Sequence, residues 1–441
     1  MGHRYGWNWV ESQVADTIAI WNSCAGCREM DACRFTVAEQ QQREQAYDQA
    51  LHEVESQLRK ARPTPAARAR AQQNMIRAFA RFSAEALGLE ESAIGLLTHD
   101  FLPVGTQLAT WARRFDAELS MPGIIQACRN AWTAAGLQPL LGARIELTPS
   151  ILAYSLLYPY SDNYLDSEEL SPEAKLRFSR NFRRRLRGET PAACNRSEVA
   201  IWTLVSLIEG QYPRHDYPDV FDCLLAIHRA QEQSISQQTA GSDDSVAELL
   251  PLSCAKGGTS VLADACLVHG RLSEAASRFA FQWGVLLQLG DDLQDIHEDL
   301  LRGSVTLFSQ AAMRSERLDE LVFQLLRFSG RVADQMDHLP DGDATLKNLL
   351  RMSWRSLILM AIAYSHEFFT PQFLSEAECC SPFRFGFLRE RRDLLAGRRG
   401  LYAKLFDAFL EPVGNDEAVP LPMPASIAFP SSVAFSEVSP L

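Results

Sequence analysis

The stretch QLGDDLQDIHED, from Gln288 to Asp299, carries five acidic residues within nine positions of an otherwise apolar helical pattern. On a helical wheel Asp291, Asp292 and Asp295 share one stripe, which continues upstream through Gln288 into a small, partly apolar lining that includes Phe281. The carboxylates of Asp291 and Asp295 stand about 6 Å apart along the helix axis, so both can reach one cation. Like charges at this spacing repel on a bare helix, whereas a divalent cation such as Mg²⁺ would hold them together. The alternative interpretation is a solvated acidic helix end.

Helical periodicity runs through most of the chain, and alternating strand patterns are nearly absent. The sequence therefore predicts an all-α protein. Its organisation is predicted as a helical N-terminal extension at 1–89, one large all-α domain at 90–411 and an irregular tail rich in Pro and Ser at 412–441. The predicted helices span 37–61, 66–88, 106–119, the region from 148, 173–187, 196–210, 217–238, 245–270, 273–301, 317–337, 344–369 and 386–411.

The bulk composition excludes several classes of protein. A net charge of −12 argues against general nucleic-acid binding. No apolar run is long enough to span a bilayer and no signal segment is evident, so we expect a cytoplasmic protein. The ten cysteines are then expected to be reduced. Cys24, Cys27 and Cys33 lie close together in CAGCREMDAC; a zinc or iron–sulfur site would need a fourth ligand and none lies nearby, so ordinary thiols are favoured and a metal site is the alternative.

A second acidic cluster occurs in YPYSDNYLDSEE, which supplies Asp162, Asn163 and Asp166 at positions i, i+1 and i+4. It too follows an apolar helical stretch, and Tyr158 lies on the same helix face one turn earlier. Pro159 is expected to kink this helix. A charged helix end is again the alternative, but two clusters of the same design make coincidence less credible.

Between the two clusters lies KGGTS, which contains Lys256 and two adjacent glycines. Because glycine disfavours a helix interior, we expect a break near Gly257–Gly258, with Thr259 or Ser260 capping the next half-helix. Such a helix start has free N–H groups that attract anions, and Lys256 adds a positive charge. The segment thus fits either a phosphate site or a simple kink.

Taken together, these residues resemble class I isoprenoid synthases. FQWGVLLQLGDDLQD is similar to the second aspartate-rich motif of that family, DNYLD to a degenerate first motif, and KGGTS to the Lys-containing segment between them. The separation of about 130 residues between the motifs also matches. The resemblance covers roughly 90–400.

The resemblance implies an antiparallel helical barrel in which three Mg²⁺ ions bridge the two motifs to a prenyl diphosphate. Diphosphate departure would leave an allylic carbocation in an aromatic-lined cavity, and a homodimer is a family-level expectation. The metal ligands it implies are Asp162, Asn163, Asp166, Asp291, Asp292 and Asp295; the catalytic candidates are Asp162, Asp166, Asp291, Asp295 and Lys256. The candidate substrate-binding residues are Lys256, Thr259, Gln288, Phe281, Tyr158 and Arg302.

The chain also departs from the subgroups of this family. It lacks the Gly-Gly-Lys-Arg segment that holds isopentenyl diphosphate in chain-elongating enzymes, and its second motif is not the Asn-Ser/Thr-Glu type of terpene cyclases. The sequence favours a terpene synthase that ionises one prenyl diphosphate and then cyclises or eliminates. A prenyltransferase that joins two isoprenoid diphosphates, of polyprenyl or squalene/phytoene type, is the alternative. A non-catalytic isoprenoid-binding or partner subunit is the third interpretation.

Overall fold

The computed structural model describes residues 4–26, 28, 30, 34–59, 64–166, 170–240, 246–398 and 400. Every regular element in these ranges is helical, which confirms the predicted all-α class. The α-helices are α1 (Trp7–Ser23), α2 (Val37–Arg59), α3 (Pro65–Glu85), α4 (Glu91–Leu96), α5 (Leu102–Phe115), α6 (Met121–Leu140), α7 (Pro149–Asp166), α8 (Pro172–Leu186), α9 (Arg196–Gln211), α10 (Pro218–Ala240), α11 (Val246–His269), α12 (Glu274–Gln294), α13 (Ile296–Arg302), α14 (Leu307–Met313), α15 (Asp319–Asp337), α16 (Ala344–Tyr364), α17 (Pro371–Glu378) and α18 (Phe385–Ala396). A π-helical segment, η1 (Leu97–Phe101), joins α4 to α5, and a 3₁₀ turn, η2 (His366–Phe368), follows α16.

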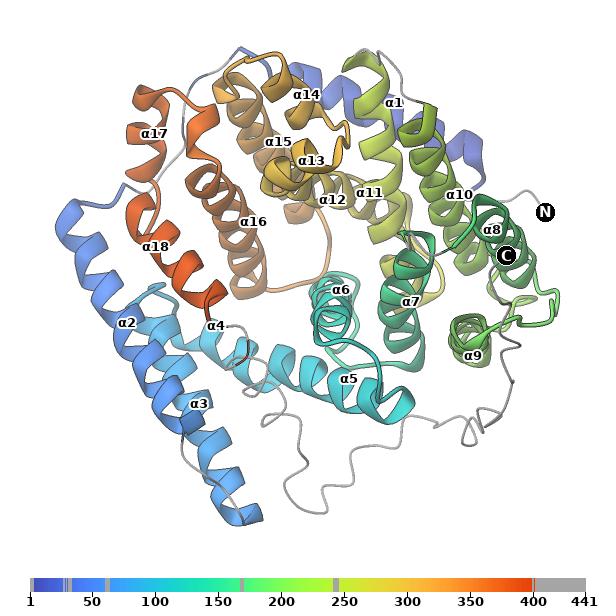
Figure 1. Cartoon of the computed structure of the whole chain (residues 1–441), viewed down its shortest axis with the longest axis horizontal. Helices are drawn as coiled ribbons and strands as arrows, with labels where there is room; N and C mark the ends of the chain where they lie inside the picture. Colours follow the sequence, from blue (N-terminus) through green and yellow to red (C-terminus); the bar gives the residue numbers. More distant parts are fainter. Residues whose placement is uncertain are drawn as a thin grey trace, which may run out of the picture.

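The centre of the molecule is the antiparallel pair α11 and α12. α11 packs against α6 and α10, and α12 packs against α15 and α16 (Figure 1). α7, α8 and α9 form a neighbouring group, in which α7 contacts α9 and α8 contacts both α9 and α10. α12 has almost no exposed apolar side chain, and Phe279, Phe281 and Leu289 on it are fully buried. The two central helices are therefore covered on most sides by other helices.

The contact between α11 and α12 depends on glycine. A Cβ atom on Gly284 would lie 2.0 Å from the carbonyl oxygen of Gly257, and one on Gly258 would lie 2.5 Å from the ring of Phe281. These distances are far below van der Waals contact, so only glycine allows the two backbones to approach this closely. The predicted helix break at Gly257–Gly258 is wrong, because α11 runs without interruption from Val246 to His269.

Thr259 and Ser260 accordingly do not cap a helix. Thr259 is fully buried and its hydroxyl donates to the carbonyl oxygen of Ala255 at 2.6 Å, one turn back in the same helix. The N–H groups that were expected to be free here instead form hydrogen bonds within the continuous helix α11.

The predicted helix at 273–301 is divided into two. α12 begins after Ser273, whose hydroxyl accepts a hydrogen bond from the amide of Ala276 at 3.1 Å and so caps the helix. It ends at Gln294, and Asp295 stands between α12 and α13 with φ −93° and ψ 9°. The acidic stretch therefore lies at a bend between two helices.

Five of the described helices have no counterpart among the predicted segments: α1, α4, α6, α14 and α17. α1 packs against α11, α12 and α15. Just before it, the Tyr5 hydroxyl lies 2.7 Å from Ser277 Oγ on α12, and Gln324 on α15 donates to the carbonyl of Trp21 at 2.7 Å. The N-terminal segment is thus packed on the main body as expected, while the domain boundaries themselves stay a prediction.

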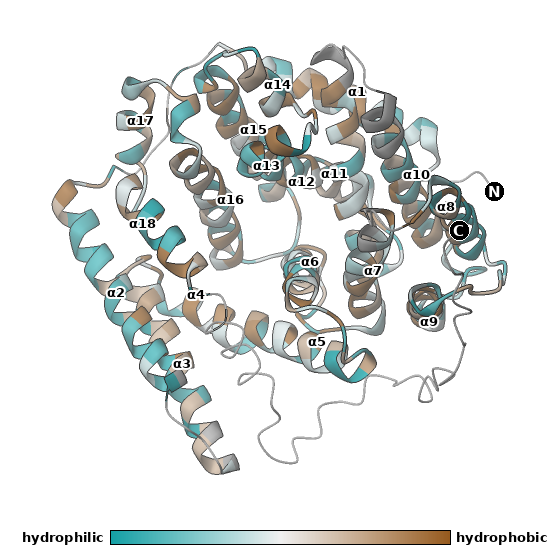
Figure 2. Cartoon of the chain, in the orientation of Figure 1, coloured by the Kyte–Doolittle hydropathy of each residue, from teal (hydrophilic) through white to brown (hydrophobic). Residues whose placement is uncertain are grey.

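α2 and α3 lie side by side at one edge of the molecule, next to α18 (Figure 1). Three ion pairs join α2 to the chain around α18: Arg391 contacts both oxygens of Asp48 at 2.6 Å, Arg384 binds Glu44, and Arg398 binds Glu55. Figure 2 shows α2 and α8 largely in hydrophilic colours, in contrast to the more apolar α7 and α11. These helices therefore form outer walls of the molecule.

Within the described ranges, no helix combines the length and apolar character needed to cross a bilayer. The cysteines described are all free thiols, including Cys24, which is buried. Cys27, Cys33 and the predicted tail at 412–441 lie outside the described residues. The proposed metal site at the cysteine cluster therefore stays a prediction.

Candidate functional site

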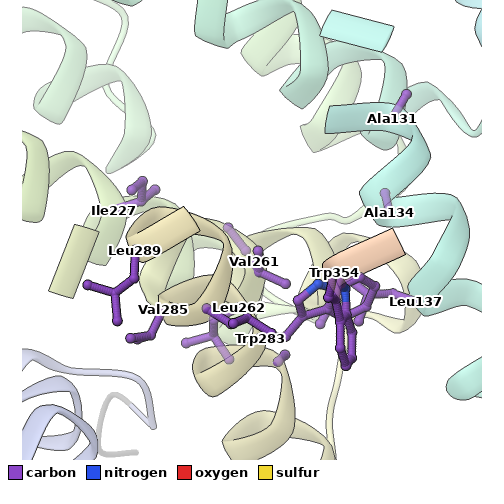
Figure 3. Close-up of a cluster of buried hydrophobic side chains, with 14 of the residues drawn as sticks. Ala131, Ala134, Leu137, Ile227, Val261, Leu262, Trp283, Val285, Leu289 and Trp354 are labelled. Carbon is purple, nitrogen blue, oxygen red and sulfur yellow. The ribbon is translucent and has the colours of Figure 1, made fainter. Parts of the chain in front are cut away.

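A cavity of about 1000 Å³ lies among α6, α11, α12 and α16, with further walls from α3 and η1. Its apolar wall includes Val261, Trp283, Leu287, Leu350, Trp354 and Leu357. The rings of Trp283 and Trp354 lie 5.4 Å apart and are inclined by 57°, and Leu137 of α6 lies beside them (Figure 3). The cavity is large enough for a small organic molecule and has the apolar, aromatic character of a ligand site.

Charged groups gather on one part of this lining. Asp291 on α12 and Asp295 at its end line the cavity together with Lys256 of α11 and Arg129 of α6. Arg129 Nη2 donates to Asp291 Oδ1 at 3.2 Å across the space between α6 and α12. Gln288, one turn before Asp291–Asp295, is also part of the lining. The structure thus brings together four residues predicted for the site and adds Arg129.

The pKa values of the two lining aspartates are both raised. Partial burial raises the pKa of Asp291, although Arg129 and Lys256 oppose this shift. Asp295 loses part of its hydration, and the charges of Asp291 and Glu298 raise its pKa further. Two carboxylates that disfavour each other's ionisation would both be stabilised by a bound cation.

Asp292 has different surroundings from its neighbour Asp291. It is buried between α12 and α11, where Gln288 Nε2 donates to Oδ1 at 2.7 Å and Ser253 Oγ donates to Oδ2 at 2.8 Å. Burial raises the pKa of Asp292 to about 6, even though these hydrogen bonds and Lys256 lower it. Asp292 was expected on the acidic stripe, but it does not line the cavity; it fixes α12 to α11 instead.

Three other predicted substrate-binding residues also lie away from the cavity lining. Thr259 is fully buried with its hydroxyl bonded to the carbonyl oxygen of Ala255, and Phe281 is fully buried against Gly258 and Trp9. Arg302 is exposed on α13 and pairs with Glu298 at 2.6 Å. The wheel placed Phe281 on the cavity stripe, but the close approach of α11 covers that part of α12.

The first acidic motif lies at the C-terminal end of α7. Tyr158 on this helix lines the cavity, and the backbone of Asp162 follows one turn later, because α7 continues past Pro159 to Asp166. The side chains of Asp162, Asn163 and Asp166 lie outside the described part of the structure. Their predicted role as metal ligands therefore stays a prediction.

The described donor set fits Mg²⁺ only in part. Aspartate oxygens at an opening to water are the ligands that Mg²⁺ takes, and it keeps several waters. However, among the side chains that the structure describes, no group of three or more His, Cys, Asp and Glu is clustered to hold a metal ion. Asp291 and Asp295 would hold Mg²⁺ only together with other ligands, such as substrate phosphates.

Arg129, Asn130 and Asp264 are among the polar residues of the cavity lining that sequence reasoning missed. Asn130 Nδ2 donates to Ser155 Oγ at 3.1 Å and to Asp264 Oδ1 at 3.0 Å, and so connects α6 to α7 and α11. A signal for Asp264 exists in SVLADACLV, where it is the single charged residue of an apolar helical run. Arg129 and Asn130 could not be assigned to the site from the sequence, because the helix that carries them was not predicted.

A second polar cluster lies between α8 and α10. Glu232 accepts hydrogen bonds from Ser179 and Arg183 and lies 3.5 Å from His228 Nε2. Burial alone would raise the pKa of Glu232, but the bonds from His228, Ser179 and Arg183 lower it to about 2. His228 and Ser179 are both buried, so this cluster joins two helices and presents no open site.

Comparison with known proteins adds no relative. No protein-family model matches the chain, and no curated protein and no solved structure is significantly similar to it. What the cavity can do therefore follows from its residues. Lys256 and Arg129 suit an anionic group, Asp291 and Asp295 suit a cation, and the tryptophan-lined wall suits an apolar body.

Proposed function

We propose that the chain is a Mg²⁺-dependent class I terpene synthase, which ionises one prenyl diphosphate and then cyclises the carbocation or eliminates a proton. The observation that carries the proposal is a single cavity that combines an apolar, aromatic wall with a group of opposed charges from Asp291, Asp295, Lys256 and Arg129. The order and spacing of the two acidic motifs support it. We also propose that the helices form the isoprenoid synthase type of barrel.

The roles of the residues follow from their positions. Lys256 and Arg129 would bind the diphosphate oxygens and stabilise the negative charge that develops as the allylic C–O bond breaks. Asp291 and Asp295 would hold Mg²⁺, with Asp162, Asn163 and Asp166 as the opposing ligands. When bound, Mg²⁺ would neutralise charge on the departing diphosphate.

The apolar wall would protect the cation. Trp283 and Trp354 present aromatic rings, whose faces attract positive charge. Exclusion of water by the apolar lining would prevent premature capture of the carbocation. Substitution of Trp354 by Leu is therefore expected to change the product distribution more than the rate of diphosphate release.

The proposal is tested by incubating the purified chain with geranyl, farnesyl or geranylgeranyl diphosphate, each alone, with Mg²⁺ or with EDTA. Release of diphosphate and of a hydrocarbon or alcohol, detected by mass spectrometry and only with Mg²⁺, is the expected result. A strict requirement for isopentenyl diphosphate would indicate a prenyltransferase instead. If no allylic diphosphate is consumed under any condition, the catalytic proposal is wrong.

A further inference from the structure

A buried carboxyl group lines the cavity without a complete set of hydrogen bonds. Asp264 on α11 is 1% exposed, and its Oδ1 accepts the hydrogen bond from Asn130. Its Oδ2 is closed off from solvent and has no hydrogen-bond partner among the described residues. Buried polar atoms are nearly always paired, and Asp264 is a residue of the cavity lining, so a ligand could supply the missing partner of Oδ2 after a small turn of the side chain toward the cavity.

The environment of Asp264 favours the neutral form of its carboxyl group. Burial raises the pKa of Asp264 well above its ordinary value, and the single bond from Asn130 offsets this only in part. A neutral carboxyl both donates and accepts hydrogen bonds. In this form Asp264 can donate a hydrogen bond to a hydroxyl group or accept one from it.

The position of Asp264 separates it from the charged group of the cavity. Asp264 follows Lys256 by eight positions along α11, which corresponds to about 12 Å along the helix axis. Trp283, on the neighbouring helix, also lines the cavity and has an indole N–H without a partner among the described residues. Two unpaired polar groups thus lie in a wall that is otherwise apolar.

We propose that the cavity binds an apolar molecule that carries a hydroxyl group, and that Asp264 with Asn130 is the binding site for that oxygen. A ligand hydroxyl would satisfy Asp264 Oδ2, whereas a hydrocarbon of the same shape would leave it unpaired and still buried. Sites built to bind a hydroxyl discriminate strongly against ligands that lack it. This inference concerns the cavity wall and does not depend on diphosphate chemistry.

The test compares two probes of the same carbon skeleton, farnesol and β-farnesene, by calorimetric titration of the full chain without Mg²⁺ or diphosphate. The wild type is expected to bind farnesol at least about ten-fold more tightly than farnesene. Asp264→Leu should remove this preference by weakening farnesol binding while farnesene binding is kept or improved. Asp264→Asn, whose amide still donates and accepts, should retain most of the preference.

Two results would overturn the inference: equal affinity of the wild type for both probes, or an unchanged preference in Asp264→Leu. Thermal melts followed by circular dichroism check that each variant is folded, and Asp264→Val replaces the Leu variant if the larger side chain disrupts the wall. Because neither probe carries a diphosphate, these outcomes are independent of whether the chain ionises prenyl diphosphates.

Discussion

At the scale of single residues, three aspartates of α12 and its end have three different environments. Asp291 pairs with Arg129, Asp292 is buried in hydrogen bonds to Gln288 and Ser253, and Asp295 stands at a helix bend. A helical wheel gives their directions but not the neighbouring helices, so it placed all three on one functional stripe. The structure assigns Asp291 and Asp295 to the cavity and Asp292 to the helix contact.

Asp291→Ala and Asp162→Ala are each expected to abolish diphosphate release, because the proposed reaction needs carboxylates from both acidic motifs. The decrease should be at least about a hundred-fold in turnover, the size of effect seen when one group that stabilises developing charge is removed. Asp334→Ala, which removes an exposed carboxylate on α15, is the control and should leave turnover unchanged.

Circular dichroism should show wild-type helical content in all three variants. Unchanged turnover in Asp291→Ala would show that Asp291 is not part of the active site.

Glu232→Gln is expected to lower the free energy of unfolding at pH 7 by about 1–3 kcal/mol, because it removes a carboxylate that holds Arg183 and Ser179. The folded pKa of about 2 lies below the ordinary value near 4.3. The carboxylate therefore stabilises the fold above about pH 4, and this contribution is lost as pH falls toward 2.

Urea denaturation of wild type and variant between pH 3 and pH 7 measures this difference. The difference between the two unfolding free energies should become clearly smaller toward the acid end. A difference independent of pH would mean that the ion pair is not its source.

At the scale of helices, periodicity predicted most of the long elements but missed several helices, of which α6 matters most for the site. The helix has buried residues on nearly every side, among them Ile124, Ala127, Cys128 and Leu137, so its sequence has no polar face to mark a period. It also contains Pro139 and three glycine or proline residues that read as turn signals. The missed helix is the one that carries Arg129 and Asn130, so part of the site was lost with it.

The glycine contact shows a different limit of prediction. Adjacent glycines disfavour a helix in isolation, but Gly257 and Gly258 allow α12 to approach so closely that tertiary packing outweighs the intrinsic preference. From one sequence, two adjacent glycines fit either a helix break or a close crossing of two helices. The structure decides between them, because Gly284 of α12 lies directly against Gly257 of α11.

Gly284→Ala is expected to destabilise the fold by about 3 kcal/mol or more, because the added methyl group would overlap the carbonyl oxygen of Gly257. Gly330→Ala is the matched control, since Gly330 is exposed in α15 and a Cβ there meets no atom within 4 Å. That control should be stabilised by about 0.5–1 kcal/mol through helix propensity. Chemical denaturation of both variants checks the prediction, and equal effects would contradict the close crossing.

At the scale of the whole molecule, the cavity is not confined to the predicted main domain. Val54 of α2 and Met75, Ile76 and Phe79 of α3 are part of its lining. The segment at 1–89 was predicted as an extension packed on the main body, without a role. It contributes one wall of the site, which no local sequence pattern reveals because the wall forms only when distant segments meet.

Trp21→Ala tests whether α1 belongs to the cooperative fold. Trp21 is 4% exposed and contacts Phe328 of α15 at 5.9 Å between ring centroids. Loss of this side chain should reduce the free energy of unfolding by about 3–5 kcal/mol. Leu301→Ala, at an 88% exposed position, should change it by less than about 0.5 kcal/mol. A small effect at Trp21 in thermal or chemical denaturation would show that α1 unfolds separately.

The backbone contact at Gly257 and Gly284 also fixes the distance between charged groups of the cavity. Lys256 and Asp291 lie on two helices that meet at this contact, so the gap between their charges cannot widen to admit a molecule. A ligand must therefore match a spacing that the backbone sets in advance, and a larger side chain at either glycine would alter that spacing together with the stability of the fold.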